Sequence, residues 1–136
     1  MPSEFVDCVI TSPPYYKLRN YGIEPDVWDA SNGCSHEFEN NFCKFCNAWN
    51  GTLGNEPTTE LYIKHLCDIF DEIKRILKST GTCWVNIGDT YNDKCLCQIP
   101  SRFSIEMCNP NWVLRDDLTE QEKEFVLTEL VRRGII

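Results

Sequence analysis

The chain has 136 residues, of which 42% are hydrophobic and 25% charged, so we expect one folded domain whose core needs no disulfides. This composition excludes a disordered chain and a membrane-spanning one. The net charge of −8 argues against strong binding of a polyanion by this chain alone, because nucleic-acid affinity comes largely from neutralised phosphates. The first residues are not a basic stretch followed by a long apolar one, so we predict a cytoplasmic protein without a signal peptide.

The first predicted element is a strand over Phe5–Ile10, whose apolar residues suit burial on both faces of a sheet. It is followed at once by Thr-Ser-Pro-Pro-Tyr-Tyr at residues 11–16. In α/β sheets ligands bind at the carboxyl ends of strands. A hydroxyl, two rigid prolines and two aromatic rings at that end indicate a slot for a flat ring. The alternative is a Pro-Pro turn that closes an ordinary strand.

Residues 17–57 form a long insertion without helical or alternating periodicity, which is uncommon in a compact domain unless the segment has a function. In a reducing compartment its cysteines are expected to be thiols or metal ligands. Cys34, His36, Cys43 and Cys46 are four ligand types with one C-x-x-C pair, which is typical of a structural tetrahedral zinc site. Such a site would stabilise an insertion that is predicted to have no hydrophobic core of its own. The alternative is a set of scattered reduced cysteines.

The other cysteines are predicted to have no part in this site, although Cys95 is a further possible ligand. Five are interpreted as small core residues: Cys8, Cys67, Cys83, Cys97 and Cys108.

An amphipathic helix is predicted after Pro57, with Thr58 or Thr59 as its N-cap and its end at residues 79–81, Ser-Thr-Gly. His65 is interpreted as a residue at the boundary of the apolar stripe, not as a metal ligand. The stripe consists of Leu61, His65, Leu66, Ile69, Phe70, Ile73, Ile76 and Leu77.

Four further elements are predicted: a strand over 82–87, a helix over 100–108, a strand over 112–115, and a helix over 119–133 that starts with a capping box and ends at Gly134. Strands that alternate with helices imply a parallel sheet with right-handed crossovers. The predicted fold class is therefore α/β. Three strands make only half of a usual sheet of this class.

The segment Ser12-Pro13-Pro14-Tyr15 resembles the catalytic motif of amino-group DNA methyltransferases, in the form common among cytosine-N4 enzymes. Further blocks in the family's order support the resemblance over about residues 4–115, among them Leu-Gly-Asn-Glu-Pro-Thr at 53–58 and Trp-Val-Asn-Ile-Gly-Asp at 84–89. The resemblance implies a partial Rossmann-like sheet of the class I methyltransferase type, S-adenosylmethionine as cofactor, and double-stranded DNA as substrate.

The resemblance also implies roles for single residues. The Ser12 side chain and the Pro13 carbonyl would accept the two protons of an exocyclic amine, Pro14 would keep the backbone rigid, and Tyr15 would stack on the flipped base. Ser12 and Asp89 are candidate cofactor contacts, although the favoured interpretation of Asp89 is a solvated turn residue. Tyr16 is either part of the slot or a packing residue.

Two features depart from the family. The cofactor motif Phe-x-Gly-x-Gly is absent from the 136 residues, which resembles the permuted beta-class arrangement, where the catalytic motif comes first and the cofactor half follows. We therefore interpret residues 1–136 as a single partial catalytic domain that needs a downstream half. Residues 116–136 form a divergent C-terminal helix in this interpretation. The alternatives are an adenine-N6 enzyme, or an inactive zinc-binding remnant or interaction module.

Overall fold

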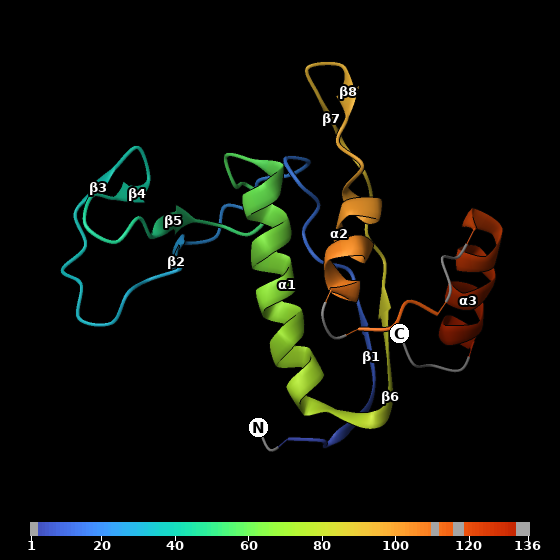
Figure 1. Cartoon of the computed structure of the whole chain (residues 1–136). Helices are drawn as coiled ribbons and strands as arrows, with labels where there is room; N and C mark the ends of the chain where they lie inside the picture. The colour runs from blue at the N-terminus through green and yellow to red at the C-terminus, as the bar shows by residue number, and fades with distance from the viewer. Residues whose placement is uncertain (1–2, 110–111, 116–118, 133–136) are drawn as a thin grey trace.

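The computed structural model describes residues 3–109, 112–115 and 119–132. Figure 1 shows helices α1 and α2 beside a pair of long strands, with the insertion extending away from them. The helices are α1 (Thr59–Ile76), α2 (Ile99–Cys108) and α3 (Glu120–Arg132). The strands are β1 (Val6–Thr11), β2 (Asp26–Trp28), β3 (Phe38–Glu39), β4 (Phe42–Cys43), β5 (Trp49–Gly51), β6 (Leu77–Val85), β7 (Tyr91–Asn92) and β8 (Cys95–Leu96).

The parallel pairing predicted for the first two long strands is confirmed, because β1 pairs with β6 in parallel. Burial of β1 on both faces is wrong. Ile10 pairs with Trp84, and both side chains are 40% exposed. On the opposite face Cys83 and Val85 pack against the core cluster. The sheet thus has one covered face within the described residues, since helices pack on one side only.

Helix α1 starts as predicted, with the Thr58 hydroxyl accepting a hydrogen bond from the Leu61 N–H at 3.2 Å. Its end differs from the prediction, because the chain enters β6 at Leu77 and not after residue 81. Pairing with β1 overrides the local stop signal. A Cβ at Gly81 would lie 2.9 Å from the Lys78 carbonyl, so this glycine allows a close backbone approach inside the strand and is not a helix cap.

The core lies between α1, α2 and the covered face of the sheet. Phe70 of α1 meets Phe103 of α2 edge to face, with ring centroids 5.0 Å apart. The predicted stripe missed two buried residues of α1, Tyr62 and Ile63, because it followed only one row of the helix. The buried cluster consists of Tyr16, Tyr62, Ile63, Leu66, Phe70, Cys97, Ile99 and Phe103.

The predicted strand over 112–115 is wrong, because these residues belong to no strand. The Trp112 N–H instead bonds to the Met107 carbonyl at 3.2 Å, and the partly buried ring packs against the core. Covering the core thus takes precedence over extending the sheet. The capping box is confirmed: the Thr119 N–H donates to the Glu122 carboxylate at 2.8 Å. The predicted stop at Gly134 lies outside the described residues.

The insertion is more ordered than its sequence indicates. It contains a four-stranded antiparallel sheet in the order β2-β5-β4-β3, and Ala48 and Trp49 in it are buried. A second hairpin, β7-β8, precedes α2. Among the described helices, none has both the length and the apolar character needed to cross a bilayer.

Candidate functional site

The Ser-Pro-Pro-Tyr segment lies where the carboxyl ends of β1 and β6 meet. The two chain segments are joined by a hydrogen bond from the Asn86 N–H to the Thr11 carbonyl, at 2.9 Å. The Tyr15 ring lies against the backbone of Gly88, so closely that a Cβ there would come within 2.8 Å of the ring atom Cδ2. Tyr15 and the segment after β6 therefore form one surface at this edge of the sheet.

The same segment is held from behind by α1. The Tyr62 hydroxyl, on a fully buried side chain, donates to the Pro14 carbonyl at 2.7 Å. Burial, with smaller contributions from Glu56 and Tyr15, raises the pKa of Tyr62, so this hydroxyl remains a neutral donor. Because the Pro14 carbonyl is bound from inside, its orientation is determined by the core.

The remaining residues of the motif differ in exposure. Ser12 is exposed, Pro13 is buried and Tyr15 is half-buried. Tyr16 is only 1% exposed, with its ring 5.3 Å from that of Tyr62, so the packing interpretation is confirmed. The motif thus presents a hydroxyl to solvent and anchors its second tyrosine in the core.

Asp89 has a defined local role. One carboxylate oxygen, Oδ1, accepts hydrogen bonds from the Thr90 N–H at 2.9 Å and the Ile99 N–H at 3.1 Å. It therefore holds the hairpin β7-β8 and the start of α2 together, a more specific role than that of a solvated turn residue.

The four predicted metal ligands come together in the insertion, with ligand atoms all within 4.8 Å of one another. Cys34 Sγ lies 3.8 Å from Cys43 Sγ, and His36 Nδ1 lies 3.4 Å from the sulfurs of both Cys43 and Cys46. The Phe45 N–H also points at Cys43 Sγ, at 3.4 Å. Cys43 lies in β4 and Cys46 in the turn after it, while Cys34 and His36 lie in the segment before β3.

The electrostatics of the cluster favour thiolates at two positions. Burial by itself raises the pKa of Cys43, but hydrogen bonds from the Cys46 backbone and the His36 ring outweigh it and lower that pKa to about 5. Backbone hydrogen bonds at Ser31 and Ala48 lower the pKa of Cys46. Burial, and then the neighbouring sulfurs, raise the pKa of Cys34 to about 12. Thiolates are the form of cysteine that binds metals, and a bound cation would offset the repulsion between neighbouring thiolates.

Two of the other cysteine predictions are wrong. Cys8 and Cys108 are exposed, because one lies on the uncovered face of the sheet and the other at the end of α2. Cys97 is buried and Cys67 and Cys83 are partly buried, as expected. Cys95 is exposed in β8 and is not part of the metal cluster.

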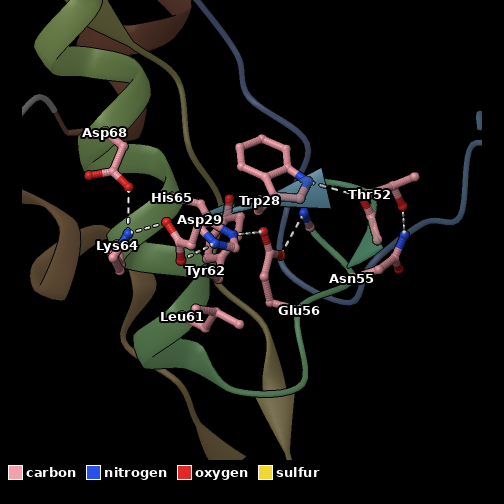
Figure 2. A network of polar contacts seen from close by, with 12 residues as sticks. Trp28, Asp29, Thr52, Asn55, Glu56, Leu61, Tyr62, Lys64, His65 and Asp68 are labelled. Carbon is pink, nitrogen blue, oxygen red and sulfur yellow. Dashed lines mark hydrogen bonds and ion pairs between the residues drawn. The ribbon is translucent and has the colours of Figure 1, made fainter. Parts of the chain in front are cut away.

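A polar network behind the motif was not predicted. His65 is fully buried and not a boundary residue: its Nδ1 lies 3.0 Å from Glu56 Oε1 and its Nε2 lies 3.3 Å from Asp29 Oδ2. Figure 2 shows the chain of contacts continuing to Lys64 and Asp68 on α1. The sequence signals for this network were only a histidine on an apolar stripe and a glutamate before a proline. Neither signal indicates which residue is the partner.

Comparison with known proteins gives the family. A family model described as DNA methylase matches residues 6–133. The type II methyltransferase M.SmaI of Serratia marcescens is 31% identical, over 87% of this chain and 41% of the relative. M.XycI of Xanthomonas campestris pv. cyanopsidis is 29% identical, over 87% of this chain and 40% of the relative. M.MwoI of Methanothermobacter wolfeii is 31% identical, over 82% of this chain and 13% of the relative.

No solved structure matches the chain significantly. The chain spans at most 41% of the length of these curated relatives. Since the family model covers nearly all of its residues, the chain belongs to the DNA methylase family, the amino-group DNA methyltransferases.

Proposed function

We propose that this chain carries the base-binding part of an S-adenosylmethionine-dependent DNA methyltransferase that modifies an exocyclic amine. The observation that carries the proposal is the position of the Ser-Pro-Pro-Tyr segment, at the joined carboxyl ends of β1 and β6 with Tyr15 against Gly88. In α/β folds this edge is where ligands bind. The parallel pair is interpreted as the beginning of a Rossmann-like sheet of the class I methyltransferase type.

The chemistry required is activation of a weak nucleophile. An exocyclic amine shares its lone pair with the ring, so two acceptors that hold its protons localise that pair on nitrogen. The exposed Ser12 hydroxyl and the Pro13 carbonyl are our candidates for these acceptors. The Pro14 carbonyl is already bound by Tyr62, which supports the assignment to Pro13. Tyr15, half-buried beside them, is the stacking surface for a flipped base.

S-adenosylmethionine supplies the methyl group when it is bound, but this chain has only part of a binding site for it. The Phe-x-Gly-x-Gly motif is absent, and the Asp89 Oδ1 atom is committed to Thr90 and Ile99. Ser12 and Asp89 are therefore at most contacts at the edge of the cofactor. We propose that a downstream half completes residues 1–136, which agrees with the uncovered sheet face at Ile10 and Trp84.

The proposed target is cytosine N4 in double-stranded DNA, with adenine N6 as the second candidate. Serine in the first motif position favours cytosine, since the resemblance is closest to that form. The basic surface for DNA is expected in the proposed downstream half, because this chain has a net charge of −8. Nucleoside analysis of DNA methylated by a complete enzyme distinguishes the two bases.

The decisive variant is Tyr15→Ala in a complete enzyme that contains this chain. We expect methyl transfer to be lost while the fold is retained, because the ring is half-buried and stacking contributes about 1–3 kcal/mol per base. Unchanged methyl transfer by a folded variant would refute the assignment.

The insertion, residues 17–57, is proposed to hold a structural zinc ion at Cys34, His36, Cys43 and Cys46. Tetrahedral coordination with ordinary bond lengths places ligand sulfurs about 3.8 Å apart and sulfur and nitrogen about 3.6 Å apart. The Cys34–Cys43 distance of 3.8 Å and the His36–Cys43 distance of 3.4 Å fit this geometry.

Metal analysis tests the zinc proposal. We expect about one equivalent of zinc in the purified chain and less than half as much in Cys46→Ser. The matched control is Cys108→Ser, which changes an exposed cysteine outside the cluster and should keep full occupancy. Equal zinc content in the two variants would contradict the site.

A zinc-binding interaction module without turnover is the second candidate. The absence of the glycine motif from these residues and the net charge of −8 favour it for the isolated chain. Calorimetry with S-adenosylmethionine separates the two functions, because the module predicts no binding at millimolar cofactor.

A further inference from the structure

Glu56 and His65 form a hydrogen-bonding polar pair that is fully buried, with both side chains 0% exposed. The two carboxylate oxygens have different partners: Oε1 lies 3.0 Å from His65 Nδ1, and Oε2 accepts the Gly54 N–H at 2.8 Å. Burial of a carboxylate is unfavourable unless each oxygen has a partner. The Glu56 carboxylate therefore connects two residues of the chain, Gly54 and His65.

The first point, Gly54, touches the base-binding segment. Its φ of +94° lies in the left-handed region, and a Cβ there would be 3.1 Å from the Tyr15 carbonyl and 3.3 Å from Pro14 Cβ. Its carbonyl accepts the Lys17 N–H at 2.7 Å. Gly54 is therefore in contact with the residues on both sides of the turn at Tyr15, and the Glu56 carboxylate holds its amide.

The second point, His65, touches the insertion. Its Nε2 faces Asp29 Oδ2 at 3.3 Å, and Asp29 directly follows β2. Its ring is stacked with Trp28 of β2 and Trp49 of β5, at centroid distances of 4.7 Å and 5.6 Å. Figure 2 shows Trp28, Asp29 and Glu56 gathered around His65. His65 thus joins the small sheet of the insertion to α1.

We propose that Glu56 and His65 are positioning residues that couple the metal-binding insertion to the base-binding segment. The path runs from β2 and β5 through His65 and Glu56 to Gly54, and from there to Pro14 and Tyr15. The proposal rests on the proposed function in naming that segment as base-binding and the insertion as metal-binding. The coupling itself is a property of this chain and is measurable without turnover.

Amide hydrogen exchange of the purified chain measures the coupling. Glu56→Leu and Glu56→Gln have similar volumes, but only glutamine keeps an acceptor for the Gly54 N–H. We expect exchange at Gly54 and Lys17 to rise at least about tenfold in Glu56→Leu and distinctly less in Glu56→Gln. The control Glu60→Gln, which changes an exposed carboxylate, should leave both amides unchanged. Equal exchange in the leucine and glutamine variants would overturn the proposal.

Asp29→Asn provides a second test, which remains valid if Glu56→Leu unfolds. Its side chain is 34% exposed, and we expect exchange at Gly54 to rise about two- to fivefold. The amides of Leu66 and Phe70 report whether α1 stays folded. If Leu66 and Phe70 keep their protection and Gly54 exchange is unchanged, the insertion is not coupled and the proposal fails.

In a complete enzyme, Glu56→Gln should lower kcat while KM for the cofactor stays constant, since only the acceptor segment is displaced. A rise in KM with constant kcat contradicts a positioning role. If the wild-type enzyme transfers no methyl group, the proposed function fails, and the exchange data still decide whether the coupling exists.

Discussion

Gly88→Ala tests the contact between the two segments at the sheet edge. The added Cβ would lie 2.8 Å from Tyr15 Cδ2 and 3.1 Å from Cζ, whereas ordinary contacts between carbon atoms are about 3.5–4.0 Å. Gly88 is not in the left-handed region, so the backbone accepts alanine and the effect is steric. Overpacking costs about 1–3 kcal/mol, while the reduced entropy of the unfolded chain stabilises by about 0.4–1 kcal/mol. We expect a net destabilisation of about 1 kcal/mol.

The sign of the effect should depend on Tyr15. In a Tyr15→Ala background the clash is absent, so Gly88→Ala should stabilise by about 0.4–1 kcal/mol. Urea denaturation of the four proteins of this cycle gives both values. The same sign in both backgrounds would show that the Tyr15 ring does not lie against residue 88. In a complete enzyme, displacement of the ring by about 1 Å should lower kcat/KM by about 100-fold.

Two further predictions concern the support of the site. Tyr62→Phe should destabilise the chain by about 1–3 kcal/mol in urea denaturation, because the Pro14 carbonyl loses its donor; a loss below about 0.5 kcal/mol would contradict this bond. Burial alone raises the pKa of Asp29, but Lys64 and His65 outweigh it and hold that pKa below its usual value of 3.8. The resulting stabilisation is present above the usual pKa and is lost as pH falls through the lowered one, so the stability difference between wild type and Asp29→Asn should shrink on acidification from about pH 6 to pH 3. A constant difference would contradict it.

Apart from the parallel pairing of β1 with β6, which the alternation of strands and helices predicted, the features predicted correctly have partners close together in the chain. The cap at Thr58 acts on a residue three positions away, and the box at Thr119 spans the same distance. The metal ligands all lie between residues 34 and 46, so their spacing was informative. Tyr16 could be assigned to either role from the sequence, and only its burial against Tyr62 decided between them.

The errors have a common origin in long-range competition. The end of α1 was misplaced because pairing of Leu77 with Val6 begins the strand before the local stop signal. The strand over 112–115 was wrong because Trp112 packs on the core beside α2. In each case an interaction with a distant segment outweighs a local preference of less than about 1 kcal/mol per residue.

The sequence by itself determined which chemical groups this protein possesses: the Ser-Pro-Pro-Tyr segment after a strand, the four metal ligands, and the family to which they point. Only the tertiary structure decided which of these groups meet. Gly88 lies against Tyr15, and His65 reaches Asp29 across 36 positions of the chain. The physical reason is that side-chain chemistry and local spacing are written in the order of residues, whereas contacts between distant segments depend on how strands and helices pack together.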